Sequence, residues 1–362
     1  MEYMARALEL ARKAMGTTSP NPAVGAVIVR NGVVVGEGFT QPPGSSHAEV
    51  MALRQAGEEA RGATMYVTLE PCSHFGRTPP CTRNIIEAGI ARVHLAVSDP
   101  NPQVSGGGRA VLESAGIGTH SGEGEAEARE VNEAYFKFIT TGIPFVAVKF
   151  AMSLDGKTAT RTGDSRWISG PRSRRCVHAL RREADAVMVG VNTVIADDPQ
   201  LTARDGRGAV IKSPLRVIVD CHGRTPTSAL VFRQPGRTLM AVGDSLGPEK
   251  VRGFEGAGAE VLPLPATRGL VDMRELLGAL GRREVTSLLV EGGGTLMTSL
   301  FEGGLADKVY AFVAPIIIGG KGAGTPVAGK GAGRMDDVLS LNGVRVKKLG
   351  RDVLVSGYTG GG

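Results

Sequence analysis

The spacing of hydrophobic positions changes repeatedly along the chain, and each change predicts an element of secondary structure. Residues 2–15 carry apolar side chains at helical spacing, which is typical of an amphipathic helix. Residues 24–29 and 33–39 are apolar runs separated by an Asn-Gly pair, the pattern of a tight β-hairpin. Helical and strand patterns then alternate to about residue 140, and this alternation indicates a three-layer α/β domain.

The remaining elements follow the same logic on both sides of a break at Gly142 and Pro144. Before the break, helices are expected over residues 47–57, 81–88, 109–115 and 123–140, and strands over residues 65–69 and 93–97. After it, strands are expected over residues 145–151, 186–190, 216–220, 238–242, 287–290 and 308–313, with helices over residues 171–183 and 295–301. We therefore predict two α/β domains, 1–143 and 144–362.

Composition and charge narrow the class of protein. The 362 residues include 42 Lys and Arg against 36 Asp and Glu, and the formal net charge is +6. The densest basic run, residues 172–182, has no interleaved aromatic side chains, which favours a solvated helix face with one or two phosphate contacts over a nucleic-acid-binding stripe. No secretory segment or run of about 18 apolar residues is visible, so we expect a cytoplasmic protein without a membrane span.

A histidine and two cysteines form the most informative pattern. His47 is followed by Glu49, and Cys72 and Cys81 lie at the end of a predicted strand and in the first turn of a predicted helix. Three protein ligands leave one tetrahedral position of zinc open, as catalytic sites require. A glutamate beside the ligands that is not itself a ligand is the general acid/base of zinc-dependent nucleobase deaminases. The sequence therefore predicts a zinc centre with Glu49 as the proton carrier.

Three other interpretations stay open on the residues alone. Two cysteines could form a disulfide, although four cysteines in all are too few for a disulfide scaffold. A structural zinc site would close with four protein ligands, and His74 could be the fourth. A nucleic-acid-editing deaminase with an appended binding domain is the main alternative. The eight residues between Cys72 and Cys81 argue against it, because those enzymes commonly carry Pro-Cys-x-x-Cys.

Long motifs extend the pattern over nearly the whole chain. They are Thr18-Ser-Pro-Asn-Pro22, His47-Ala-Glu-Val50, Thr68-Leu-Glu-Pro-Cys-Ser-His74, Gly76-Arg-Thr-Pro-Pro-Cys81, Asp99-Pro-Asn-Pro102, Ser153-Leu-Asp-Gly-Lys157, Trp167-Ile168, Ala196-Asp-Asp-Pro199 and Val290-Glu-Gly-Gly-Gly294. In these motifs and their order the chain closely resembles the bifunctional riboflavin biosynthesis deaminase/reductase family.

The resemblance implies a fold and two activities. The N-terminal half is expected to be cytidine-deaminase-like, with one Zn²⁺, and to deaminate 2,5-diamino-6-ribosylamino-4(3H)-pyrimidinone 5′-phosphate. The C-terminal half is expected to be dihydrofolate-reductase-like and to reduce the ribosyl group of that product to ribityl with NADPH. The implied partner is thus a pyrimidine ribose phosphate, with no nucleic acid and no membrane, and the enzyme is expected to be a homo-oligomer.

The resemblance also implies roles at individual positions. In the deaminase half they are zinc ligands at His47, Cys72 and Cys81, the proton carrier Glu49, and substrate contacts at Asn21, His74 and Arg77. In the reductase half they are NADPH contacts at Ala151, Trp167, Thr193, Asp197, Gly293, Gly294, Thr295, Leu296, Met297, Thr298 and Ser299, substrate contacts at Ser165, Arg181, Leu201, Arg204 and Glu291, and a catalytic basic group at Lys149. Cys221 departs from the serine expected in some members, which leaves its cofactor role open.

Local chemistry supports some of these roles independently. A glycine-rich turn before a predicted helix, as at residues 291–295, attracts phosphate through its backbone amides. Lys149 stands in a largely apolar strand, which favours a functional role over a surface one. For Trp167 core packing, for Asn21 a turn, and for Arg181 and Arg204 an ordinary surface position remain alternatives without the resemblance.

Overall fold

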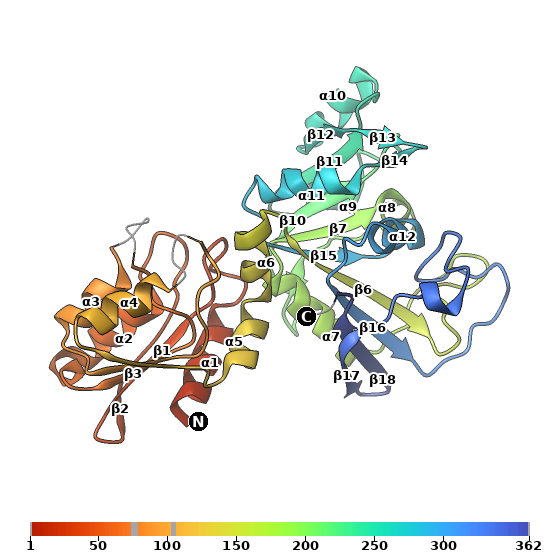
Figure 1. Cartoon of the computed structure of the whole chain (residues 1–362). Coiled ribbons are helices and arrows are strands. Elements are labelled where there is room, and N and C mark those ends of the chain that lie inside the picture. The colour runs from red at the N-terminus through yellow and green to blue at the C-terminus, as the bar shows by residue number, and fades with distance from the viewer. Residues whose placement is uncertain (1, 74–78, 103–105, 361–362) are drawn as a thin grey trace. The chain divides into compact units, whose positions relative to one another are not determined.

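The computed structural model describes residues 2–73, 79–102 and 106–360. The chain forms two compact units, Met1–Ile143 and Pro144–Gly362, each with its own sheet (Figure 1). Among the described residues, no helix has the length and apolar character needed to cross a membrane.

The first unit is a five-stranded sheet with the order β2-β1-β3-β4-β5. Its strands are β1 (Gly25–Arg30), β2 (Val33–Phe39), β3 (Thr64–Val67), β4 (Arg92–Leu95) and β5 (Gly118–Ser121). Its α-helices are α1 (Glu2–Ala14), α2 (Ala48–Ala56), α3 (Cys81–Glu87), α4 (Gly107–Ser114), α5 (Glu125–Val131) and α6 (Glu133–Thr141). The structure confirms the predicted hairpin, the three-layer α/β class, and the helices expected at residues 47–57 and 81–88. Strand β5 was not predicted.

Glycines let two helices approach opposite faces of this sheet closely. A Cβ on Gly25 would lie 2.0 Å from the carbonyl oxygen of Ala7 in α1. A Cβ on Gly36, in the neighbouring strand, would lie 2.2 Å from the carbonyl oxygen of Ala52 in α2. Gly36 pairs with Ile28, which points to the face opposite to Gly25 because side chains alternate along a strand. Helix α2, which begins just after His47, is therefore fixed against the sheet by backbone contact.

The predicted helix over residues 123–140 is wrong in one respect, because it is two helices broken at Asn132. The buried side chain of Asn132 accepts a hydrogen bond from the backbone N of Ala23 at 2.8 Å and donates one to the carbonyl of Ala23 at 3.1 Å. Asparagine readily replaces helical hydrogen bonds with side-chain bonds of this kind. The break therefore anchors the loop that carries Asn21.

The second unit is built on a nine-stranded sheet with the order β12-β11-β10-β7-β15-β6-β16-β18-β17. These strands are β6 (Phe145–Ser153), β7 (Ala186–Gly190), β10 (Leu215–Val219), β11 (Thr238–Gly243), β12 (Glu260–Leu264), β15 (Ser287–Glu291), β16 (Lys308–Ala314), β17 (Asn342–Leu349) and β18 (Asp352–Tyr358). Two small sheets pair β8 (Ala203–Arg204) with β9 (Val210–Lys212) and β13 (Ala266–Thr267) with β14 (Leu270–Val271).

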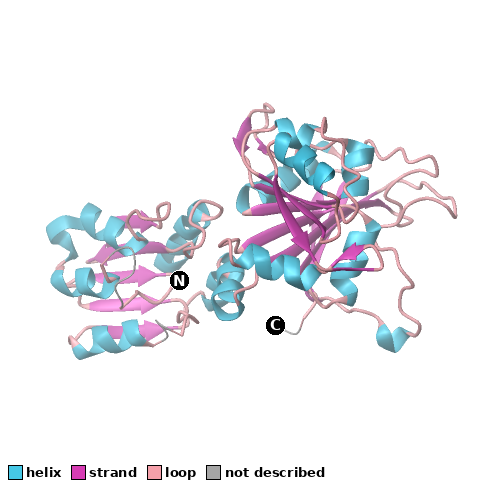
Figure 2. Ribbon diagram, turned by 90° about the horizontal axis from the view of Figure 1, so that it is seen from above, coloured by secondary structure: helices cyan, strands magenta, loops and turns pink. Residues whose placement is uncertain are grey.

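Helices flank this sheet (Figure 2). They are α7 (Pro171–Glu183), α8 (Val191–Asp197), α9 (Leu230–Arg233), α10 (Pro248–Gly256), α11 (Met273–Gly281) and α12 (Gly294–Glu302). In the order of the sheet, the seven strands from β12 across to β16 run parallel to one another. Strands β18 and β17 then add antiparallel pairs at one edge. Every predicted strand of this half is present. The elements that were not predicted are β12, β17, β18, the four strands of the two small sheets, and the helices α8, α9, α10 and α11.

The parallel strands β10, β7, β15 and β6 are neighbours in the middle of the sheet. Their carboxyl ends therefore meet at one edge, where ligands bind in open α/β sheets. The loops after these strands carry most of the residues predicted for the reductase half.

Candidate active sites of a deaminase and a reductase

Three segments supply the residues of the first site: the start of α2, the segment after β3, and the start of α3. His47 is the N-cap of α2 and Cys81 is the first residue of α3, as predicted. The Nδ1 atom of His47 lies 3.1 Å from Sγ of Cys81 and 3.7 Å from Sγ of Cys72. The three ligand atoms all lie within 4.8 Å of one another.

These side chains fit a zinc ion. Zn–S bonds of about 2.3 Å and Zn–N bonds of about 2.0 Å in a tetrahedron separate the ligand atoms by about 3.5 Å, close to the distances found here. The backbone N of Cys81 also donates to Sγ of Cys72 at 3.3 Å. The hydrogen bond between the two cysteine side chains is the main cause of both pKa shifts. As acceptor, Cys72 is stabilised as a thiolate and its pKa is lowered, whereas Cys81 is held as the donating thiol and its pKa is raised. All four cysteines of the chain are free thiols, so no disulfide forms.

Glu49 is the second residue of α2, two residues after His47, and is 4% exposed. Burial raises the pKa of its carboxyl group, and the charge of His47 opposes the rise. A carboxyl group with a raised pKa can both take and give a proton near neutral pH. The burial of Glu49 beside the cluster is thus suited to acid/base chemistry.

A buried carboxylate that was not predicted organises the loop beside this site. Glu70, two residues before Cys72, accepts hydrogen bonds from the backbone N of Asp99 at 3.3 Å, Gly106 at 3.2 Å and Arg109 at 3.0 Å. The hydroxyl of Tyr135 in turn donates to Asp99 at 3.1 Å. Glu70 and Asp99 both lie in motifs quoted above, but neither residue was assigned a role from the sequence.

The predicted deaminase substrate contacts are only partly visible. Asn21 lies in a turn in which its backbone N donates to the carbonyl of Thr18 at 2.8 Å. His74 and Arg77 lie outside the residues that the structure describes.

The second unit contains a buried group of charges. Lys149 of β6 and Glu291 of β15 are register partners on adjacent strands, and Nζ of Lys149 lies 3.6 Å from Oε2 of Glu291. Arg181 of α7 donates from Nε to Oε1 of Glu291 at 2.5 Å and from Nη2 to Oε2 at 3.0 Å. Burial alone would raise the pKa of Glu291, but the charges of Arg181 and Lys149 outweigh it and lower the pKa to about 2.

Arg181 of this group also contacts the segment that directly precedes β8. Arg181 donates to the carbonyl of Thr202 at 3.1 Å, and Arg204 donates to the Thr202 hydroxyl at 3.1 Å. Leu201 is buried in the left-handed region with φ 56°. The structure therefore gathers Lys149, Arg181, Leu201, Arg204 and Glu291 around one segment. Ser165 instead donates to Asp197 at 3.0 Å.

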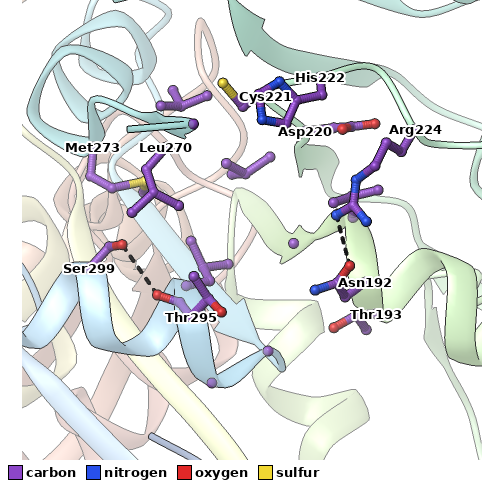
Figure 3. A pocket seen from close by; sticks show the side chains of 18 residues that line it. Asn192, Thr193, Asp220, Cys221, His222, Arg224, Leu270, Met273, Thr295 and Ser299 are labelled. Atoms are coloured by element: carbon purple, nitrogen blue, oxygen red, sulfur yellow. Dashed lines mark hydrogen bonds between the residues drawn. The ribbon is translucent and has the colours of Figure 1, made fainter. Parts of the chain in front are cut away.

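A cavity of about 250 Å³ opens at the carboxyl edge of β10, β7 and β15 (Figure 3). One wall is the glycine-rich turn: Gly293 has φ 81°, and α12 begins directly after it. Of the predicted cofactor residues, those that line the cavity are Thr193, Gly293, Gly294, Thr295, Leu296 and Ser299. The N-terminus of α12 thus lines the cavity, and a helix N-terminus in such a place fits a cofactor phosphate.

The other predicted cofactor residues lie elsewhere in this unit. Trp167 is 66% exposed, with the guanidinium carbon of Arg174 4.6 Å from the centre of its ring, so it is not a core residue. Met297 is fully buried, and the hydroxyl of Thr298 donates to the carbonyl of Gly294 at 2.8 Å. Ala151 lies on β6 beside Phe312, and Asp197 ends α8. The cavity lining that was missed includes Asn192, Asp220, His222, Arg224, Leu270 and Met273.

Known proteins resemble both units. Residues 1–97 match the model of the cytidine and deoxycytidylate deaminase zinc-binding region, and residues 144–355 match the model of the RibD C-terminal domain. The riboflavin biosynthesis protein RibD of Aquifex aeolicus is 45% identical over 353 residues, which cover 98% of this chain and 96% of that protein. This chain belongs to the RibD family.

Other RibD proteins match equally completely. The Escherichia coli protein is 41% identical over 97% of both chains. A structure of Acinetobacter baumannii RibD superposes with a TM-score of 0.89 at 37% identity, covering 99% of this chain and 98% of that one. The Thermotoga maritima diaminohydroxyphosphoribosylaminopyrimidine deaminase/5-amino-6-(5-phosphoribosylamino)uracil reductase superposes with a TM-score of 0.83 at 36% identity, with the same coverage.

Membership of the RibD family settles the class of enzyme. The protein is a bifunctional enzyme of riboflavin biosynthesis, with a zinc-binding deaminase domain and an NADPH-dependent reductase domain. The match over the full length supports this interpretation over the nucleic-acid-editing deaminase considered above. The N-terminal cytidine-deaminase-like fold and the C-terminal reductase fold are confirmed.

Proposed function

We propose that the enzyme hydrolytically deaminates 2,5-diamino-6-ribosylamino-4(3H)-pyrimidinone 5′-phosphate and then reduces the ribosyl group of the product to ribityl. The observation that carries the proposal is that one chain holds both a His–Cys–Cys cluster with a buried glutamate and a glycine-lined cavity near a buried cluster of basic side chains. The deamination adds water and releases ammonia, and the reduction consumes one NADPH. The Thermotoga maritima relative carries both activities in its name.

In the deaminase half we assign zinc binding to His47, Cys72 and Cys81. Zinc supplies an activated water when it is bound. Glu49 would take one proton from the attacking water and pass it to the ring nitrogen, and would then carry the proton of the added hydroxyl to the amine, which leaves as ammonia while the ring carbon becomes a carbonyl. Its buried carboxyl group, with a raised pKa, suits it to both transfers. We assign substrate contacts to Asn21, and to His74 and Arg77, which lie in the segment that the structure does not describe.

In the reductase half we assign the cofactor phosphates to the turn at Gly293 and Gly294, at the start of α12. The proposal keeps the remaining NADPH contacts at Ala151, Trp167, Thr193, Asp197 and residues 295–299. Lys149 would act as the basic group near the ribose, since it is less than one-fifth exposed and is held by Glu291. Arg181 and Arg204, together with Ser165 and Leu201, would bind the substrate, whose phosphate suits a guanidinium fork.

One experiment tests the two activities separately. The intact enzyme would be incubated with the diaminopyrimidine ribotide, and ammonia release and NADPH oxidation would be followed independently. We expect ammonia release without added NADPH and NADPH oxidation only after deamination. NADPH oxidation that precedes ammonia would contradict the proposed order, and no ammonia release would contradict the deaminase assignment.

We also propose that the two activities separate at the boundary between residues 143 and 144. Gly142 ends α6 in the left-handed conformation with φ 70°, and Pro144 directly precedes β6. A fragment from Pro144 onward should bind NADPH and reduce the deaminated substrate. A folded fragment that did neither would contradict the boundary or the assignment of the second unit.

The proposal includes a homo-oligomer. Strand β17 is the last strand of its sheet, and Val344 and Val346 on it are 52% and 69% exposed. Met335 and Leu339, shortly before it, are 81% and 53% exposed. An exposed apolar face on an edge strand is commonly covered by another chain, while the opposite face of β17 carries Arg345 and Lys347. Val346→Lys should lower the mass measured by light scattering if this edge is the interface.

The proposal finally places the enzyme in the cytoplasm and gives it no nucleic-acid or membrane partner. The cytoplasmic location is supported by the four cysteines, which are all free thiols, the state that a reducing compartment maintains. Fractionation of cells that produce the protein would test the first point, and a binding assay with tRNA the second.

A further inference from the structure

The cavity in Figure 3 has a wall with an exposed arginine, Arg224, to which the proposed function gives no role. The loop after β10 supplies Cys221, His222 and Arg224 to one side of the cavity, and the turn at Gly293 supplies the other. Arg224 and Asn192 lie on the side opposite to Leu270 and Met273 (Figure 3). The cavity is therefore polar at one end, where the guanidinium of Arg224 and the buried carboxylate of Asp220 line it, and apolar at the other.

The guanidinium of Arg224 is exposed and held in position. Its Nη2 atom donates to Oδ1 of Asn192 at 2.8 Å, and Asn192 belongs to the first turn of α8. A guanidinium carries several N–H donors in a fork, so one bond orients the group without exhausting it. The remaining geometry suits a dianionic phosphate rather than a hydroxyl.

The imidazole of His222 fits this wall of the cavity because of a glycine opposite to it. A Cβ on Gly269, in the turn between β13 and β14, would lie 3.0 Å from Nε2 of His222. Glycine at this position therefore leaves room for the imidazole. The ammonium of Lys250 donates to the carbonyl of His222 at 2.6 Å, which brings a further cation to this loop.

The order of the strands gives the spacing between the two walls. Strands β15, β7 and β10 are adjacent, and neighbouring strands lie about 4.8 Å apart, so the loops after β15 and β10 start about 10 Å apart. A dinucleotide whose pyrophosphate lies at Gly293 can then extend in two directions. Toward β6 lies the cluster of Lys149 and Glu291, and toward β10 lie Arg224 and the apolar wall.

We propose that Arg224 is the residue that selects NADPH over NADH, by binding the 2′-phosphate of the adenosine ribose. The inference rests on the proposed cofactor site at Gly293. The adenine would then lie against Leu270 and Met273, and the nicotinamide would extend toward β6 and the basic cluster. Arg224 acts on affinity and specificity, and Asn192 positions it.

Binding of the two dinucleotides to the intact, zinc-loaded enzyme tests this. Arg224→Gln keeps an amide that can donate to Asn192 but removes the charge, and Arg224→Lys keeps the charge without the fork. We expect Arg224→Gln to raise the Kd of NADPH about 10- to 100-fold, the usual effect of losing a charged hydrogen bond, and to change the Kd of NADH less than about twofold. Arg224→Lys should fall between wild type and Arg224→Gln. Arg207→Gln, at an exposed loop outside the cavity lining, is the matched control and should change neither Kd.

Each other outcome has a definite meaning. Equal weakening of both dinucleotides by Arg224→Gln, or no weakening of either, overturns the 2′-phosphate assignment. The same holds if Arg207→Gln has the same effect, because the change would then be one of general charge. Failure of the wild-type enzyme to bind NADPH at all would instead refute the proposed cofactor site, and it is visible before any variant is made.

Discussion

The carboxylate of Glu291 is clasped by the guanidinium of Arg181 through two hydrogen bonds, of 2.5 Å and 3.0 Å. The two side chains come from β15 and α7, which are far apart in the sequence. Lys149 approaches the same carboxylate, so that one buried anion holds two cations in place. In this account Glu291 sets the position of the basic groups that meet the substrate.

Replacement of Glu291 by Gln should destabilise the second unit. Removing one partner of a buried ion pair leaves the other uncompensated, at a cost of about 3 kcal/mol. Trp167 is the only tryptophan of the chain and lies in the second unit, so its fluorescence during chemical denaturation reports on that unit alone. Unchanged unfolding of Glu291→Gln would show that the clasp adds no stability.

The effect of this substitution should also depend on pH. The folded-state pKa of Glu291 is about 2, below the ordinary value of 4.5, so its ionisation favours the folded state. That stabilisation is complete above about pH 5 and is lost as the pH falls toward 2. The stability difference between wild type and Glu291→Gln should therefore shrink over this range. A difference that grew on acidification would contradict the ion-pair account.

Glu70→Gln should weaken the deaminase half selectively. An amide offers one acceptor oxygen where the carboxylate offers two, and its NH₂ group would face a backbone N–H of the loop around Asp99 and Gly106. Loss of such a buried bond costs about 1–3 kcal/mol. Ammonia release should be lost at a lower temperature than in wild type, while NADPH oxidation keeps its thermal profile. Glu87→Gln, at an exposed helix position, is the matched control and should leave both profiles unchanged.

Gly293→Val should raise the Kd of NADPH by at least about tenfold, because a side chain would then cover the amides at the start of α12. A valine at φ 81° also strains the backbone. Gly208→Val controls for that strain, since Gly208 has φ 88° in a turn with nothing within 4 Å of an added Cβ. Unchanged NADPH affinity of Gly293→Val would remove this turn from the cofactor site, and deamination should be unaffected in either case.

The zinc cluster could be predicted from the sequence because each of its residues lies in a short motif with its own structural signals. Cys81 follows a proline, and α3 begins there as expected. Arg224 could not be found in this way. It meets the turn at Gly293 only because β10 and β15 both lie beside β7, and the order of parallel strands is not encoded in any local pattern. The family resemblance pointed to Gly293 and to Cys221 in the loop after β10, but nothing in it singled out Arg224.

Two errors in the fold have different causes. The break at Asn132 depends on its hydrogen bonds with Ala23, more than a hundred residues earlier, so the helical pattern continued across it. Strand β17 was missed because side chains on both of its faces are exposed. It therefore lacks the alternation of buried and exposed side chains that marks a strand with one buried face. A contact between distant segments thus decided the break at Asn132, whereas β17, among the described strands, is paired only with β18, the strand that follows it.

The most direct test of the account is Glu49→Gln in the full-length enzyme. The structure buries this carboxylate beside the three zinc-ligand candidates without making it one of them. We predict one zinc per chain by metal analysis, undetectable ammonia release from the diaminopyrimidine ribotide, and wild-type NADPH oxidation with the deaminated substrate. Ammonia release at the wild-type rate from the zinc-loaded variant would contradict the role of Glu49 and, with it, the proposed mechanism of deamination.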